Sequence, residues 1–97
     1  MINFDNQFSN ILEKYNNIEK SLNTMEDISS ENLIKLNMEY AELKPIVEKI
    51  EEYKKEKNEI LNLNELIKDT DQEIIRIAEL ELIEKKNLIK LLEDQLL

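Results

Sequence analysis

The sequence predicts an all-α fold, an elongated antiparallel three-helix bundle or helical hairpin with a long, proline-kinked central helix. The composition, 41% hydrophobic and 36% charged residues, is typical of long amphipathic helices. The chain has no Gly, and the tight hairpin turns of β-sheets need residues that adopt positive φ. Apolar residues also recur at alternating spacings of three and four along three segments, the period of a helix face. A length of 97 residues predicts a single helical domain over residues 1–97.

The first predicted helix covers residues 3–24. Its apolar residues are spaced 4-3-4-3-4-3, the pattern of a helix that packs along its length against another helix. They are Phe4, Phe8, Ile11, Tyr15, Ile18, Leu22 and Met25.

The second predicted helix covers residues 30–67. Ser29 is a good N-cap because its hydroxyl can accept a hydrogen bond from an amide of the first turn. Ile28 and Leu33 flank it at the positions of a hydrophobic staple. The apolar stripe is Leu33, Leu36, Tyr40, Leu43, Val47 and Ile50, and beyond it Tyr53, Ile60 and either Leu63 or Leu66.

Pro45 interrupts this second helix. A proline inside a helix removes one backbone hydrogen bond and clashes with the carbonyl four residues earlier, which costs roughly 3 kcal/mol. Either the helix is kinked near residues 41–44, or two helices meet there with Pro45 in the first turn of the second. The apolar stripe keeps its phase across Pro45, which favours a kinked continuous helix. Beside this structural role, a kink that shapes a partner surface stays open.

The third predicted helix covers residues 71–96. Thr70 and Glu73 have the spacing of a capping box. The stripe comprises Ile75, Ala78, Leu82, Ile89, Leu92 and Leu96, widened by Ile74, Ile77, Leu88 and Leu91. Such a wide apolar face predicts contact with two neighbours rather than one.

The residue types that are missing limit the chemistry. The chain has neither Cys nor His, so it lacks a thiol nucleophile, a thiolate zinc site and the commonest general base. A metal site would have to consist of carboxylates, and the spacing of an EF-hand loop does not occur. We therefore expect no enzymatic activity, no cofactor and no metal.

The net charge of −9 argues against polyanionic partners. DNA and other nucleic acids are bound through clustered basic residues, and anionic membranes also attract basic segments. The longest apolar runs are two residues, as in Leu96-Leu97, too short to cross a bilayer. Residues 1–5 lack the features of a secretion signal. We expect a cytoplasmic location and binding to neither DNA nor membranes.

Acidic and aromatic residues of the second helix are the candidates for recognition. The acids between Glu48 and Glu59 suggest either a metal site or a solvated helix face with ion pairs four residues apart, and the second interpretation is favoured. Among them Glu48, Glu51 and Glu52 are possible partner-facing acids. The tyrosines of this helix lie on the apolar stripe and are expected to pack rather than to recognise a ligand. Arg76, in the third helix, is expected to pair with Glu73 or Glu79.

One stretch carries a family resemblance. Residues 36–53 contain Glu39, Tyr40, Ala41, Glu42 and Leu43, followed by Pro45-Ile46-Val47 and by a helix that reaches Tyr53. This motif resembles the first domain of bacterial class I peptide chain release factors, in the branch that reads UAA and UAG. The Asp-rich turn at 68–71, the segment 78–81 and Leu91-Leu92 are similar too, so the resemblance covers the whole chain. The absence of Trp favours this branch over its sister.

The resemblance implies a docking role. In that family the codon-reading tripeptide and the Gly-Gly-Gln loop lie in later domains, so no residue here is expected to be catalytic or codon-reading. The end at Leu96-Leu97 has no C-cap and is expected to be a boundary within a larger protein. The first domain is expected to dock on ribosomal protein near the GTPase-associated centre, with the class II release-factor GTPase as a further partner. The isolated chain is expected to be monomeric.

Two other functions stay open. The chain is alternatively a free-standing acidic coiled-coil adaptor or scaffold that dimerises through the wide face of its third helix. An acidic inhibitor that mimics nucleic acid is less favoured, because the acids are interleaved with lysines. A Gly-Gly-Gln motif downstream in the reading frame would separate a release factor from both.

Overall fold

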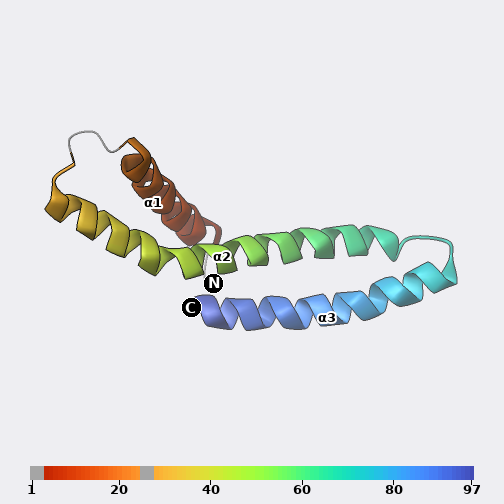
Figure 1. Ribbon diagram of the computed structural model, residues 1–97. Coiled ribbons are helices and arrows are strands. Elements are labelled where there is room, and N and C mark those ends of the chain that lie inside the picture. The colour runs from red at the N-terminus through yellow and green to blue at the C-terminus, as the bar shows by residue number, and fades with distance from the viewer. Residues whose placement is uncertain (1–3, 25–27) are drawn as a thin grey trace. The chain divides into compact units, whose positions relative to one another are not determined.

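The computed structural model describes residues 4–24 and 28–97 (Figure 1). It contains three helices, α1 (Phe4–Thr24), α2 (Ser30–Leu66) and α3 (Gln72–Leu96). Within these ranges no residue is in a β-strand, so the predicted all-α class and helical order are confirmed. The predicted start of the first helix at residue 3, and Met25 of its stripe, lie outside the described residues.

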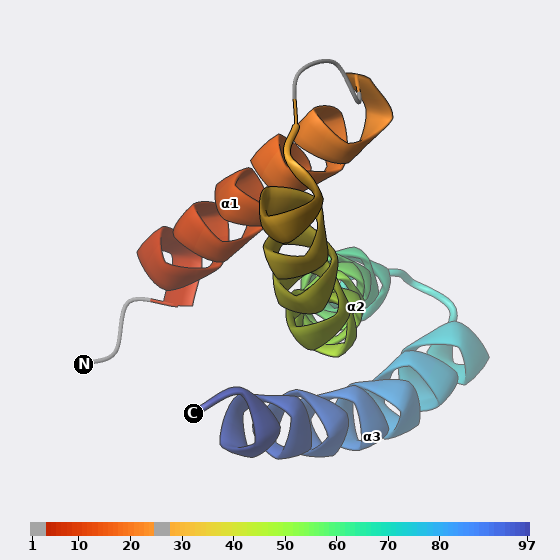
Figure 2. The ribbon, with the colours of Figure 1, turned by 60° about the vertical axis from the view of Figure 1, so that its left-hand side comes forward.

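The helices form two compact units that divide α2 between them. Unit 1 is Met1–Glu48 and contains α1 and the first half of α2, whereas unit 2 is Lys49–Leu97 and contains the second half of α2 and α3. In unit 1 the chain folds back after α1, and in unit 2 α3 runs back alongside α2 (Figures 1 and 2). Each unit is therefore a pair of helices with its own core. A single domain over residues 1–97 stays a prediction.

Side-chain caps fix the starts of α2 and α3. The Ser29 hydroxyl accepts a hydrogen bond from the Asn32 amide at 3.2 Å, as the sequence indicates. At α3 the cap is Asp71, whose carboxylate accepts from the Glu73 amide at 2.9 Å. The predicted capping box of Thr70 and Glu73 was therefore wrong. A charged carboxylate accepts more strongly than a hydroxyl and favours the positive end of the helix, so the helix begins one residue later.

Helix α2 is continuous through Pro45, so the chain does not begin a new helix there. Pro45 has no N–H, and the carbonyl of Ala41 therefore lacks its usual helical donor. Both residues are exposed. Water can reach the carbonyl, which makes the proline tolerable at this position.

The core of unit 1 is small. Phe8 and Ile18 of α1 and Val47 of α2 are buried, and the Phe4 and Phe8 rings pack with their centroids 5.3 Å apart. The other described members of both predicted stripes are half-buried: Phe4, Ile11, Tyr15, Leu22, Leu33, Leu36, Tyr40 and Leu43. The 3-4 spacing thus identified the core side of both helices.

The core of unit 2 lies between the second half of α2 and α3. Leu63 packs in one cluster with Ala78 and Leu82, and Ile60 and Ile67 pack against it. Ile50, Tyr53 and Leu92 are also buried. Because Leu66 is exposed, the alternative between Leu63 and Leu66 is decided in favour of Leu63.

The wide apolar face of α3 is only partly covered. Ile74, Ile77 and Leu91, which widen the predicted stripe, are exposed, and so are Leu80 and Ile83. Contact of this face with two neighbours, which the sequence predicts, is thus not found among the described residues of unit 2.

Substitution of Ile50 tests the importance of the buried stripe of α2. Ile50 has no exposed surface, so Ile50→Ala should lower the free energy of unfolding by about 2–5 kcal/mol. Ile34→Ala, on the same helix at 61% exposure, should change it by less than about 0.5 kcal/mol. Urea unfolding followed by circular dichroism measures both, and equal effects of the two substitutions would contradict the observed packing.

Candidate functional site

The motif between Glu39 and Pro45 lies on α2 within unit 1. Tyr40 and Leu43 are half-buried, whereas Glu39, Ala41, Glu42 and Pro45 are exposed. The helical period separates these two sets, since residues three or four apart share a side of the helix. The motif therefore supplies both packing residues and accessible surface.

Tyr40 has the packing role that its place in the stripe predicts. Its ring stacks on that of Tyr15 from α1, with centroids 4.6 Å apart and planes 14° from parallel. The hydrogen bond between the two side chains, burial, and the negative charges of Glu19 and Glu48 raise the pKa of Tyr15 to about 12. The tyrosine pair thus joins α1 to the motif by ring stacking.

The three acids named as possible partner-facing residues are Glu48, Glu51 and Glu52, and all are exposed. They lie within five positions of one another on α2. Their accessibility is compatible with contact to a partner, and that contact stays a prediction.

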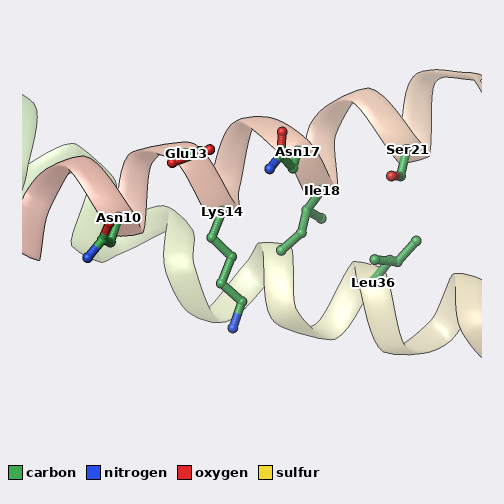
Figure 3. A pocket seen from close by; sticks show the side chains of 7 residues that line it. All are labelled: Asn10, Glu13, Lys14, Asn17, Ile18, Ser21 and Leu36. Atoms are coloured by element: carbon green, nitrogen blue, oxygen red, sulfur yellow. The ribbon is translucent and has the colours of Figure 1, made fainter.

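A groove of about 390 Å³ lies between α1 and the first half of α2. Figure 3 shows Ile18 and Leu36 pointing into the space between the helices and Lys14 reaching across it. The other lining residues are Asn10, Glu13, Asn17 and Ser21. Its polar lining thus combines two amides, one hydroxyl, one acid and one base.

The acids between Glu48 and Glu59 do not all lie on a solvated face, so that interpretation was wrong for Glu56. Glu56 is only 6% exposed. Its Oε2 atom is 2.7 Å from Nζ of Lys85 in α3, and the same ammonium is 2.5 Å from Oε2 of Glu59. Glu56 is buried because it lies on the side of α2 that carries Tyr53 and Ile60.

In the cluster of Glu56, Glu59 and Lys85, the ammonium balances the charge of the carboxylates. Among the described residues, Glu56 Oε2 has no partner in hydrogen-bonding geometry, so the adjacent ammonium provides its compensation. Contacts with Glu56 and Glu59 raise the pKa of Lys85 above its usual value. The hydrogen bond from Lys85 lowers the pKa of Glu59. A buried charge pair within an apolar seam adds little net stability, but it disfavours other alignments of the two helices.

A signal for this cluster was present in the sequence. Lys85 lies between Leu82 and Ile89 at spacings of three and four. It therefore occupies a core position of the α3 stripe, although the predicted stripe did not include it. A lysine at such a position indicates a partner acid on the facing helix.

The remaining candidates have structural contacts. The Tyr53 hydroxyl donates a hydrogen bond to Glu93 at 3.2 Å, and Lys57 lies over the Tyr53 ring, 5.0 Å from its centroid. Arg76 pairs with Glu73 at 2.6 Å on the surface, one of the two partners predicted for it. These contacts need no ligand to explain them.

Residues 4–24 and 28–97 also bear on metal binding and on membrane crossing. In these ranges no group of three or more acidic, His or Cys side chains is placed to hold a metal ion. No helix there is long and apolar enough to cross a membrane.

Comparison with known proteins gives one family and several relatives. The PCRF domain family matches residues 11–97. Peptide chain release factor 1 of Malacoplasma penetrans is 42% identical over 92 residues, which is 94% of this chain and 25% of that protein. The proteins of that name from Wolbachia pipientis and Anaplasma marginale are 32% and 33% identical, over 91% and 98% of this chain and 25% and 27% of their own lengths. The chain thus spans about a quarter of the length of these relatives, and no solved structure matches it.

Removal of the Lys85 ammonium tests the buried pair. Lys85→Met leaves the Glu56 carboxylate buried without its cation, which should lower the midpoint of thermal unfolding by roughly 5–15 °C at pH 7. As a control, the double substitution Glu56→Leu and Lys85→Leu should restore or exceed the original midpoint, because it removes both charges together. An unchanged midpoint in Lys85→Met would show that the pair does not compensate a buried charge.

The effect of Lys85→Met on the midpoint of thermal unfolding should depend on pH. The lowered pKa of Glu59 stabilises the fold above the usual carboxyl value, and this stabilisation is lost as pH falls through the folded-state pKa. Lys85→Met lacks this stabilisation. The difference in midpoint between the two proteins should therefore narrow below about pH 4.5.

The tyrosine stack predicts an abnormal titration. Tyr15 should ionise near pH 12 in the unsubstituted chain, and at a lower pH in Tyr40→Phe, which lacks the hydroxyl but leaves burial and the charges of Glu19 and Glu48 in place. Tyrosine ring carbon shifts in NMR resolve this titration residue by residue. Because the folded-state pKa is raised, the contribution of Tyr15 to stability is complete below pH 10 and is lost as pH rises toward 12. Ionisation of Tyr15 near pH 10 in the unsubstituted chain would contradict the hydrogen bond.

Proposed function

Because the chain belongs to the PCRF domain family, we propose that it serves as the ribosome-docking domain of a translation termination factor that reads UAA and UAG and promotes peptidyl-tRNA hydrolysis. Family membership confirms the resemblance to class I release factors that the stretch from Glu39 to Pro45 indicated. The observation that carries the proposal is the 42% identity, across 94% of the chain, to a protein named peptide chain release factor 1.

In this proposal the chain binds and other parts of the factor perform the chemistry. It has neither His nor Cys, and its exposed acids suit basic protein surfaces better than rRNA phosphates. We therefore assign it contact with ribosomal protein at the GTPase-associated centre, and with the class II release-factor GTPase. Stop-codon reading and hydrolysis are assigned to residues beyond this chain, and the site of action is the cytoplasm.

A domain exchange tests the termination role. The corresponding first quarter of the Malacoplasma penetrans factor is replaced by this chain, and release of formylmethionine is measured on ribosomes stopped at UAA, UAG or UGA. The chimera should release at UAA and UAG with a rate within about tenfold of the parent, a loss below 1.4 kcal/mol in the activation free energy. The parent factor without its first quarter is the control. A chimera no more active than that control would refute the proposal.

Co-sedimentation tests docking separately. The 97-residue chain should pellet with 70S ribosomes, and less of it should pellet with ribosomes stripped of the proteins at the GTPase-associated centre. Binding that does not change on stripping would move the docking site elsewhere. A tight dimer in sedimentation equilibrium, without ribosome binding, would favour the adaptor or scaffold instead.

A further inference from the structure

Helix α3 carries a row of large aliphatic side chains that its own unit leaves uncovered. The row is Ile74, Ile77, Leu80 and Ile83, named here the α3 ridge, and all four are exposed. Leu80 and Ile83 have 54% and 60% of their surface accessible. Single exposed apolar residues are ordinary on a protein surface, whereas a contiguous apolar row marks an interaction site.

The spacing of the ridge matches the geometry of helix packing. Its members follow one another at intervals of three, and such rows form the ridges that enter grooves on a facing helix. The core of unit 2 uses other positions of α3, namely Ala78, Leu82 and Leu92. Successive ridge members are displaced by about 60° around the helix, so Ile74 lies beside the core position of Ala78 and the later members turn away from it. Leu80 and Ile83, the most exposed of the four, are therefore available to a second helix while α2 stays packed on the core side.

The charges beside the ridge indicate which charge its partner carries. Five acidic and two basic side chains lie three or four positions from its members, namely Asp71, Glu73, Glu79, Glu81, Glu84, Arg76 and Lys86. One of the two cations, Arg76, is already paired with Glu73 at 2.6 Å. The flanks are thus acidic, and a complementary partner carries Lys or Arg beside its own apolar residues.

From these observations we infer that the α3 ridge is the docking surface for a basic amphipathic helix of another protein. The inference rests on the proposed function, because the partner is sought among ribosomal proteins. A second copy of the chain would place acidic flanks against acidic flanks, and rRNA offers phosphates in place of an apolar surface. The apolar ridge supplies affinity, while the acids supply long-range attraction and orientation.

The first experiment measures affinity with a matched control. The double variant Leu80→Ser and Ile83→Ser should bind 70S ribosomes at least about tenfold more weakly than the unsubstituted 97-residue chain. The control variant Ile34→Ser and Met38→Ser removes two large apolar side chains of 61% and 60% exposure from α2 in unit 1. It should bind within about twofold. Circular dichroism and urea midpoints should be unchanged in both variants, since all four residues are exposed.

The second experiment identifies what covers the ridge. The chain has no Cys, so Ile83→Cys provides a single attachment point for a maleimide photocrosslinker, with Ile34→Cys as the control at matched exposure. Irradiation with 70S ribosomes should join the first variant to a Lys- and Arg-rich helix of a ribosomal protein, several-fold more than the control. Crosslinking mainly to rRNA, or to a second copy of the chain, would overturn the inference.

The outcomes separate this inference from the proposed function. If the unsubstituted chain binds ribosomes and the Leu80→Ser, Ile83→Ser variant binds equally well, the ridge is not the docking surface and the proposed function stands. If the unsubstituted chain does not bind ribosomes, the proposed docking function fails and the inference fails with it. A triple change of Glu79, Glu81 and Glu84 to Gln should also weaken binding severalfold at low salt and less at high salt. Equal weakening at both salt concentrations would overturn the assignment of a basic partner.

Discussion

Burial along α2 is the interaction on which both units depend. A helix of 37 residues in water gains little stability from its own hydrogen bonds, so packing of its apolar side must hold it. Val47 is part of the core of unit 1, and Ile50 and Tyr53 are part of the core of unit 2, all with almost no exposed surface. Each such side chain contributes about 1.5–3 kcal/mol when fully buried. A break in α2 would remove one side of each core, and the exposed position of Pro45 lets the helix continue.

Unit 2 shows how this chain combines stability with specificity. Its apolar cluster around Leu63 and Leu82 supplies the stability. Glu56 and Lys85, at the core positions of the facing helices, add a buried ion pair at 2.7 Å. Leucine pairs tolerate slippage along a seam, whereas a misaligned pair of buried charges would leave both uncompensated. The same unit leaves the α3 ridge uncovered, so stabilising and binding surfaces occupy different sides of one helix.

These features can be related to the similarity between this chain and peptide chain release factors. The chain spans about a quarter of the length of those relatives. In the proposed docking role, the acidic surface directs encounter with a partner and the uncovered apolar ridge holds the complex by apolar contact. The motif at Glu39–Pro45 contributes both packing and accessible surface, since Tyr40 packs on Tyr15 while Ala41 and Pro45 are exposed.

The sequence by itself determined the three helices, the Ser29 cap, the core side of α1 and the family, because each depends on local chemistry, a repeating period or a motif. The tertiary structure alone decided that Glu56 is buried, that Leu63 and not Leu66 is in the core, and that the α3 ridge is uncovered. A period of 3.6 residues tells which side chains share a face, but burial depends on where a second helix lies against that face. The tertiary structure also decided that Asp71 and not Thr70 is the cap of α3. Two adjacent side chains could accept the hydrogen bond, and the path of the backbone selected one of them.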